Sequence, residues 1–212
     1  MSEHAIHTHF PGRLIFIGFG SIGQGVLPLI LRHVGGLAAE RITIVTADDA
    51  GREEAGRYGI KFINHPLTRE NFRHVLDPLV GRGDFVLNLS VDVSSIALIK
   101  LCHEQGALYL DTCIEPWPGG YTDSNIPASR RTNYALREEV LELRKAWSNG
   151  PTAVITHGAN PGLVSHFVKQ ALLDIAAGCG RDPGDPKSRE DWATLAKDLG
   201  VKVIHIAERD TQ

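Results

Sequence analysis

Polar residues that follow short apolar runs are the strongest candidates for chemistry in this chain, and Glu115 is the least expected of them. Glu115 comes directly after the apolar pair Cys113-Ile114 and lies close to Trp117. A carboxylate in such surroundings is either paired with a cation or directed at a cationic ligand, because burying an isolated charge is costly. The residues that could converge on one crevice are Asn88, Ser90, Asp92, Thr112, Glu115, His157 and Asn160.

The segment GFGSIG, residues 18–23, has the G-x-G-x-x-G spacing of a phosphate-binding turn. It lies between an apolar run and an amphipathic segment, where a dinucleotide pyrophosphate needs backbone N–H groups, a helix N-terminus and no Cβ in the way. The motif alone is a weak signal and could be a tight structural turn, but the alternating elements around it favour a dinucleotide site. Its expected contacts are Gly18, Gly20, Ser21, Ile22 and Gly23.

The residue that would contact the adenosine ribose is less clear from the sequence. Thr46 ends the second apolar run, and Asp48 and Asp49 follow it. Asp48 is a candidate for the ribose hydroxyls, although it lies slightly late for that role and could be a solvated turn residue. Two adjacent carboxylates would repel a 2′-phosphate, so NAD is favoured over NADP.

Some of these residues have structural alternatives. Ser90, Asp92 or Ser94 could cap the helix that follows them. Asn160 before Pro161 has the pattern of a helix N-cap with proline at the first helical position. A cap whose backbone lines the cofactor pocket could serve both purposes, so the alternatives stay open.

Short β-branched runs alternate with helical periodicity, which predicts an α/β fold with a Rossmann-like, doubly wound parallel sheet of six strands. A second domain, for substrate binding or dimerisation, is expected to begin near the C-terminus. The expected domains are residues 1–178 and 188–212, with a linker rich in Gly, Pro and Asp at 178–187. The expected strands are 13–20, 41–46, 59–63, 84–90, 107–115, 152–158 and 201–212, and the expected helices are 21–36, 71–80, 94–106, 133–147, 163–177 and 188–200.

Composition limits the classes of partner. The net charge of −3 gives no reason to expect nucleic acid, and no apolar run is long enough for a signal core or a membrane span. An odd number of widely spaced cysteines indicates reduced thiols. We therefore expect a cytoplasmic protein, without nucleic-acid or membrane partners. His4, His7 and His9 suggest a mobile N-terminal tail, and no metal is assigned.

Several motifs together resemble the N-terminal half of bacterial homospermidine synthase, which is related to the saccharopine dehydrogenase group. The resemblance covers nearly the whole chain from about residue 12, and IEPW and GANPGLVS are its most specific parts. Members of that family are about twice as long, so the resemblance implies a fragment or truncated product. The motifs are IGFGSIGQGVLPLI, NLSVDVSS, ALYLDTCIEPW, SNIPASRRTNYALRE, HGANPGLVSHFVKQAL and HIAERDTQ.

The resemblance implies a transferase that uses tightly held NAD to condense two putrescines into homospermidine with loss of ammonia. A hydride is removed from the carbon bearing one amine, the second diamine attacks the resulting imine, and the hydride returns, so there is no net redox change. The resemblance also implies a homodimer of the full-length family. As alternatives, the chain could be a saccharopine-dehydrogenase-like oxidoreductase or a non-catalytic NAD-binding module.

Site residues are carried over from the matching motifs. Glu115 matches the family's acid on the fifth strand, and Asp92, Asn160 and Glu208 fall on motifs that handle the amine or lie near the nicotinamide. Glu208 could instead pair with an arginine in a structural role. The expected cofactor contacts also include Asp48, Asn88, Ser90, Thr112, Asn160 and Pro161.

Overall fold

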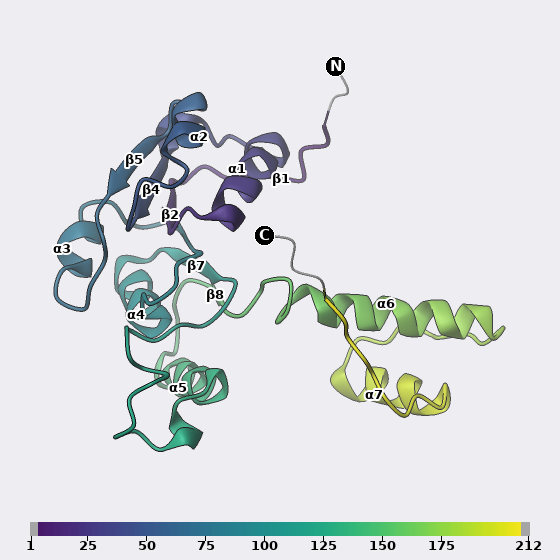
Figure 1. The fold of residues 1–212 in the computed structure, drawn as a ribbon. Coiled ribbons are helices and arrows are strands. Elements are labelled where there is room, and N and C mark those ends of the chain that lie inside the picture. Colours follow the sequence, from purple (N-terminus) through teal and green to yellow (C-terminus); the bar gives the residue numbers. More distant parts are fainter. Residues whose placement is uncertain (1–3, 209–212) are drawn as a thin grey trace. The chain divides into compact units, whose positions relative to one another are not determined.

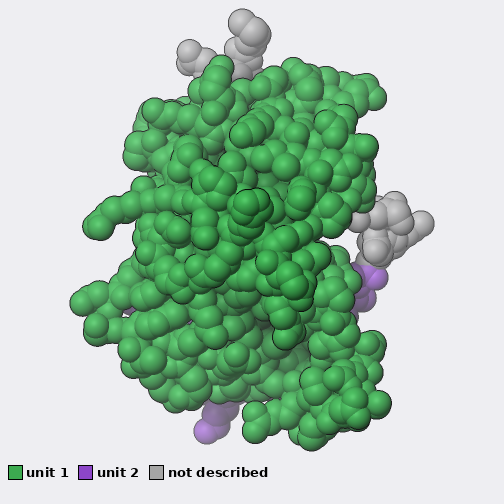
Figure 2. All heavy atoms as spheres, turned by 90° about the vertical axis from the view of Figure 1, so that its left-hand side faces the viewer, with its two compact units in different colours: residues 1–156 green, residues 157–212 purple. Residues whose placement is uncertain are grey.

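The structure, a computed structural model, describes residues 4–208. The chain divides into two compact units, residues 1–156 and 157–212 (Figure 2). The predicted domain boundary at residues 178–187 falls within the second of these units. That domain assignment stays a prediction.

Unit 1 contains a parallel sheet of six strands (Figure 1). The strands lie in the order β5-β4-β2-β6-β7-β8, which corresponds to 3-2-1-4-5-6 in chain order and confirms the Rossmann-like prediction. The chain reverses its direction of travel across the sheet between β2 and β6, the place where such sheets bind ligands. The strands are β2 (Leu14–Ile17), β4 (Ile42–Thr46), β5 (Lys61–Asn64), β6 (Phe85–Asn88), β7 (Leu108–Asp111) and β8 (Ala153–Val154).

Helices follow the strands, as the periodicity predicts. Of the helices in residues 4–208, α1 to α5 lie in unit 1, and α6 and α7 lie in unit 2. The helix α7 begins with the capping box formed by Ser188 and Asp191. The helices are α1 (Ser21–His33), α2 (Arg52–Arg57), α3 (Phe72–Leu76), α4 (Ser95–Gln105), α5 (Asn133–Ala146), α6 (Leu163–Gly178) and α7 (Arg189–Asp198), with 3-10 turns at Ala39–Arg41 and Ala128–Arg130.

The core lies on both faces of the sheet because alternate residues of a strand point to opposite faces. Ile15 and Ile17 of β2 belong to one apolar cluster, and Leu14 and Phe16 belong to the other. All four side chains are buried. A strand covered on both faces reads as a continuous apolar run, which is why the central strands were recognisable from the sequence.

Two predicted strands are shorter in the structure. The strand β7 ends at Asp111, not at Glu115, and β8 has only two residues. Side chains replace the ladder beyond these points: Glu115 N–H donates to Ser95 Oγ at 3.0 Å, and Thr156 N–H donates to Asp111 Oδ1 at 2.6 Å. Glu115 therefore lies in a loop after the strand.

The predicted strand at residues 201–212 is wrong for its described part. Residues 201–208 form no strand in unit 2, because no described segment pairs with them, and the rest lies outside the described residues.

The N-terminal segment is more ordered than expected of a mobile tail. Thr8–His9 forms strand β1, which pairs in parallel with β3 (Val34–Gly35) directly after α1. The His7 and His33 rings stack with centroids 5.2 Å apart. Within residues 4–208, neither a helix suited to crossing a membrane nor a metal-binding group of three His, Cys, Asp or Glu residues is found.

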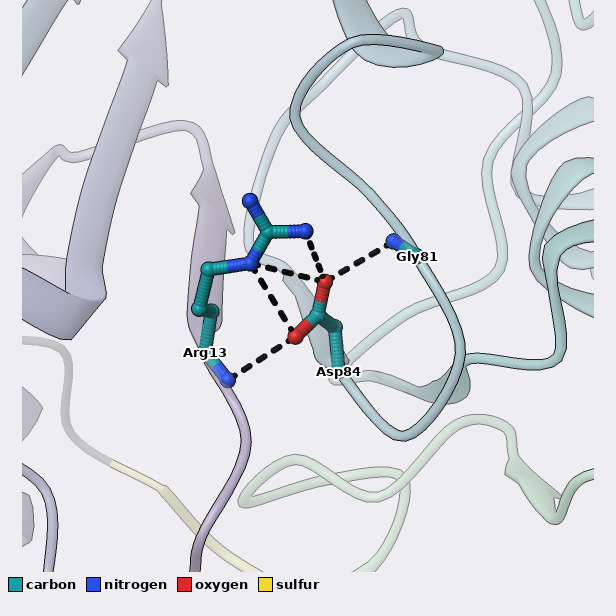
Figure 3. Close-up of polar contacts among 3 residues, drawn as sticks. All are labelled: Arg13, Gly81 and Asp84. Atoms are coloured by element: carbon teal, nitrogen blue, oxygen red, sulfur yellow. Dashed lines mark hydrogen bonds and ion pairs between the residues drawn. The ribbon is translucent and has the colours of Figure 1, made fainter.

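An ion pair between half-exposed Arg13 and buried Asp84, the residues directly before β2 and β6, lies at the amino end of the sheet (Figure 3). Asp84 accepts hydrogen bonds from Arg13 Nη2 at 2.6 Å, Arg13 Nε at 3.0 Å, Arg13 N at 2.9 Å and Gly81 N at 2.8 Å. The Asp84 carboxylate is therefore neutralised by a cation and bonded at both oxygens. Such a site is stabilising and leaves no charge for a ligand.

Candidate functional site

The glycine turn follows β2 at the point where the chain reverses across the sheet. Gly18 has φ of +82°, and a Cβ there would lie 2.8 Å from the backbone N and Cα of Ser90. A Cβ on Gly23 would lie 2.9 Å from the Phe19 ring. These two glycines are needed for the turn and its packing, whereas a Cβ on Gly20 would meet nothing within 4 Å. Gly20 thus leaves open space on the outside of the turn.

The first turn of α1 suits an anion. Its N-cap is Gly20, no side chain caps the helix, and no acidic residue lies in its first turn. The first backbone N–H groups of a helix have no partner within the helix and lie at the positive end of its dipole. Ser21 is exposed, and Ile22, although apolar, is 52% exposed. This arrangement fits the phosphates of a dinucleotide.

Asp48 and Asp49, the two acids after β4, make different contacts. Asp48 is exposed, and its Oδ1 accepts a hydrogen bond from Ala50 N at 2.8 Å. Asp49 pairs with Arg52, whose Nη2 lies 2.5 Å from Oδ1, and this hydrogen bond lowers the pKa of Asp49. The argument against a 2′-phosphate therefore rests on Asp48, because the charge of Asp49 is neutralised.

A buried polar network occupies the carboxyl ends of β6 and β7. Asn88 Nδ2 donates to the Tyr109 hydroxyl at 3.1 Å, and that hydroxyl donates to Asp111 Oδ2 at 2.9 Å. Ser90 Oγ donates to Asn88 Oδ1 at 2.6 Å. Burial raises the pKa of the Asp111 carboxyl, against hydrogen bonds from Thr156, Tyr109 and Ser95 that lower it. No cation neutralises Asp111 within the described residues.

Glu115 is half-buried and makes no ion pair within residues 4–208. Its backbone is fixed by two hydrogen bonds with Ser95, one in each direction. Burial is the main cause that raises the pKa of its carboxyl, and repulsion from Asp92 and Asp111 adds to it, whereas a hydrogen bond with Cys113 opposes it. Of the two alternatives that the sequence left open, the internal cation is not found, so Glu115 is available to a cationic ligand.

The capping alternatives for the β6–α4 connection are also decided. Ser94 is the N-cap of α4, and its Oγ accepts from Ala97 N at 3.3 Å, so neither Ser90 nor Asp92 has that role. Asp92 is exposed and has φ of +62°, a conformation that residues other than glycine rarely adopt. Unusual backbone of this kind is frequent at functional sites. Thr112 is half-buried directly after β7.

The second group of predicted residues lies in unit 2. Asn160 Nδ2 donates a hydrogen bond to Glu208 Oε1, which brings together two residues that are distant in sequence. The prediction that Asn160 caps α6 is wrong: the N-cap is Gly162, with φ of +129°, and the helix begins at Leu163, so Pro161 precedes it. Leu163 N, at the first helical residue, donates to Gly158 O at 2.8 Å.

Unit 1 thus collects one set of candidates and unit 2 another. In unit 1, Gly18 touches Ser90, and Glu115 lies beside Asp92. In unit 2, Asn160 contacts Glu208, whereas the His157 ring lies against His166 with centroids 5.7 Å apart. Trp117 packs against Phe72 and the apolar core.

Sequence reasoning missed Tyr109, Asp111 and Ser95. All three are buried: Tyr109 and Asp111 lie within the predicted strand 107–115, and Ser95 is the first residue of α4. A signal was present for Asp111, because an aspartate at the carboxyl end of a parallel strand is a typical ligand-side position. Cys113 also contacts Glu115, and burial with that repulsion raises the pKa of its thiol to about 11, so it is not a ready nucleophile.

A separate pocket of about 650 Å³ lies beside α4, α5 and residues 148–155. It includes His103, whose ring stacks on Trp147 with centroids 3.8 Å apart. None of the predicted site residues lines it. Its position near the amino end of β8 is unlike the ligand position of open α/β sheets, so we do not assign the chemistry there.

A family model described as the saccharopine dehydrogenase NADP binding domain matches residues 14–154, more than half of the chain. The chain belongs to this family. The matched segment begins with β2 and ends with β8, so the saccharopine dehydrogenase NADP-binding domain coincides with the six-stranded sheet. The predicted relation to the saccharopine dehydrogenase group is therefore confirmed.

Individual relatives are homospermidine synthases. That of Blastochloris viridis is 48% identical over 100% of this chain and 45% of its own length, and that of Mesorhizobium japonicum is 45% identical over 98% and 44%. The crystal structure of homospermidine synthase from Legionella pneumophila in complex with NAD has a TM-score of 0.80 and 42% identity, covering 92% of this chain and 40% of that one. The predicted resemblance is confirmed, and the chain spans less than half the length of these relatives.

Proposed function

We propose that the chain is the NAD-binding part of a homospermidine synthase, which condenses two putrescines with release of ammonia. The observation that carries this proposal is the environment of Glu115. Its half-buried carboxylate has no cation partner among residues 4–208 and lies beside further acids at the carboxyl end of the sheet. A diamine carries two ammonium groups, and such a site is complementary to one of them. The identity with homospermidine synthases over the whole chain supports the same substrate class.

NAD would bind at the glycine turn, where the residues present fit it. The uncapped α1 N-terminus, with Gly20, Ser21 and Ile22, would hold the pyrophosphate, and Gly18 and Gly23 would shape the turn. NAD supplies a reversible hydride acceptor when bound. The NAD that is present in the Legionella pneumophila structure supports this assignment. The remaining proposed contacts are Asp48 for the ribose, and Asn88, Ser90, Thr112, Asn160 and Pro161.

Glu115 would orient one ammonium group and accept its proton. A unit charge pair at about 4 Å is worth roughly 4 kcal/mol before desolvation at an effective dielectric near 20, enough to prefer a diamine to a neutral amine. Burial raises the pKa of Glu115, which makes its carboxylate a better proton acceptor than an exposed one. Asp92 in unit 1, and the Asn160–Glu208 pair in unit 2, are the further proposed amine-handling groups.

The test compares two substitutions that remove the same charge. Glu115→Gln should weaken putrescine binding by the NAD-loaded 212-residue chain about tenfold or more, because a charge-assisted contact is lost, while NAD affinity changes less than twofold. Glu139→Gln removes an exposed carboxylate on α5 and should change neither. Calorimetric titration measures both affinities. Equal losses for NAD and putrescine with Glu115→Gln would show a structural role and contradict the proposal.

A second candidate is an NAD-dependent oxidoreductase of the saccharopine dehydrogenase type, which the family match favours. The two functions differ in redox balance. Net NADH absorbance at 340 nm on mixing with amine would indicate the oxidoreductase, whereas homospermidine and ammonia without net NADH would indicate the synthase. We expect the 212-residue chain to bind NAD with little turnover alone, as a binding module, because it spans less than half of its relatives. The cytoplasmic location and the homodimer of the full-length enzyme belong to the same proposal.

A further inference from the structure

The buried network between Ser90 and Asp111 runs in one direction, and both of its ends fix that direction. At the inner end, Asp111 Oδ1 accepts from the Thr156 backbone N–H, and a carboxylate only accepts, so the Tyr109 hydroxyl must donate to Oδ2. The Tyr109 oxygen then accepts from Asn88, which must present its Nδ2. The amide oxygen of Asn88 is left facing Ser90.

The outer end gives the same direction independently. The Ser90 backbone N–H, which can only donate, lies 3.2 Å from Asn88 Oδ1. Because this contact also places the amide oxygen toward Ser90, the Ser90 hydroxyl proton is donated to Asn88 Oδ1 at 2.6 Å. The Ser90 oxygen therefore keeps only its lone pairs for another partner.

Ser90 lies at the place where a bound dinucleotide would pass. Its backbone N and Cα are 2.8 Å from the position of a Cβ on Gly18, so it packs directly against the glycine turn. Ser90 is half-buried, whereas Asn88, Tyr109 and Asp111 are 2%, 1% and 0% exposed. The network thus connects a fully buried carboxylate to one partly accessible oxygen at the glycine turn.

Building on the proposed NAD site, we propose that Tyr109 and Asp111 are positioning residues that fix Ser90 Oγ as a hydrogen-bond acceptor for a ribose hydroxyl of the bound dinucleotide. A phosphate offers no donor at neutral pH, whereas each ribose offers hydroxyl groups, so an oxygen limited to accepting is suited to a ribose. Tyr109 and Asp111 act only through Asn88 and Ser90. If these hydrogen bonds only stabilised the fold, NAD affinity would not depend on which groups of the network donate and which accept.

Asp111→Asn should set the two ends of this hydrogen-bond network against each other. The Thr156 N–H still needs an acceptor, so the new amide oxygen faces it and the new amide nitrogen faces Tyr109. If the Tyr109 hydroxyl then donates to Asn88 Oδ1, the Asn88 nitrogen faces the Ser90 backbone N–H, which can only donate. Ser90 Oγ also loses the acceptor for its proton. Ser90 Oγ is then no longer fixed as an acceptor at the glycine turn.

The test is a double-mutant cycle on NAD affinity, measured by calorimetry with the 212-residue chain. Ser90→Ala, Tyr109→Phe and Asp111→Asn should each weaken NAD binding about threefold to tenfold, the effect of one hydrogen bond. Asp111→Asn should have no further effect in the Ser90→Ala background, because both remove the same contact. Asp84→Asn, the same change at the other end of the sheet, should lower the melting temperature but leave NAD affinity within twofold.

NAD analogues that each lack one ribose hydroxyl identify the contact. The analogue that lacks the contacted hydroxyl should bind the unsubstituted chain as weakly as NAD binds Ser90→Ala. Its affinity should not change further with Asp111→Asn. Additive losses in the cycle, or unchanged NAD affinity in folded Asp111→Asn, would overturn the positioning role while leaving the NAD site intact. Absence of NAD binding by the unsubstituted chain would overturn the proposed function, and this inference with it. If Tyr109→Phe does not fold, Asp111→Asn still tests the positioning role.

Discussion

Asp84 and Asp111 are buried carboxylates at opposite ends of neighbouring strands, and they are satisfied in different ways. Asp84, 5% exposed at the amino end of β6, is held by the Arg13 guanidinium and two backbone N–H groups. Asp111, 0% exposed at the carboxyl end of β7, has donors from Tyr109, Thr156 and Ser95, and residues 4–208 provide no cation for it. The Asp84 carboxylate at the amino end of the sheet is thus paired with a cation, whereas the Asp111 carboxylate at the carboxyl end is held only by hydrogen-bond donors.

The difference separates a stabilising site from a functional one. An ion pair that is complete within the protein has no capacity for a ligand. Asp111 and Glu115 are desolvated and have no cation partner in the described part of the chain, and burial raises the pKa of both. A cation or a donor that binds to such a carboxylate stabilises its charged form. Groups with perturbed pKa values are concentrated at functional sites. In this sheet they lie at the carboxyl end, beside the glycine turn.

The largest effect on stability is expected from removing the ion pair between Asp84 and Arg13. Asp84→Asn replaces an acceptor oxygen with an amide that faces the Arg13 donors, and we expect it to reduce the free energy of unfolding by about 2–4 kcal/mol. Arg13 is half-exposed and can regain water, which keeps the loss below that of a fully buried pair. Urea denaturation measures the change. A loss below about 0.5 kcal/mol would show that the ion pair does not stabilise the sheet.

A smaller effect, on affinity alone, is expected at the glycine turn. Gly20→Ala adds a methyl group into open space, with φ of −75° that alanine readily adopts. We expect stability within about 0.5 kcal/mol of the original but NAD binding weakened at least tenfold, because the methyl group occupies the place of the phosphates. Gly18→Ala is the matched comparison: its φ of +82° and backbone contact should cost about 1–3 kcal/mol of stability. Calorimetry and urea denaturation together separate the two effects.

The smallest effect concerns pH. Because the pKa of Asp111 is raised in the folded state, folding favours its protonated form, and this contribution is complete below the unfolded value near 3.8 and is lost as pH rises through the raised folded value. Asp111→Asn removes it. The stability of the unsubstituted chain relative to Asp111→Asn should therefore fall as pH rises from 3.5 to about 7, in urea denaturation at several pH values. A relative stability that rises over this range would contradict the assigned burial of an unneutralised charge.

Much of the sheet was predictable because its signal is local. Ile15 and Ile17, like Leu14 and Phe16, are apolar because both faces of a central strand are covered, and the glycine spacing follows from the turn that β2 must make. Glu115 was recognisable as an acid out of place. The ends of elements were less predictable. The Ser95 hydroxyl accepts the Glu115 N–H beyond the end of β7, and Gly162, not the predicted Asn160, is the N-cap of α6.

The sequence by itself determined the alternation of strands and helices, the position of the glycine turn and the presence of acids after the strands. These properties depend on periodicity and residue type within a short window. Only the tertiary structure decided which carboxylate has a cation. Arg13 meets Asp84, while Tyr109 and Asn88 form a one-way chain to Asp111, because parallel pairing of strands distant in sequence sets which side chains are neighbours.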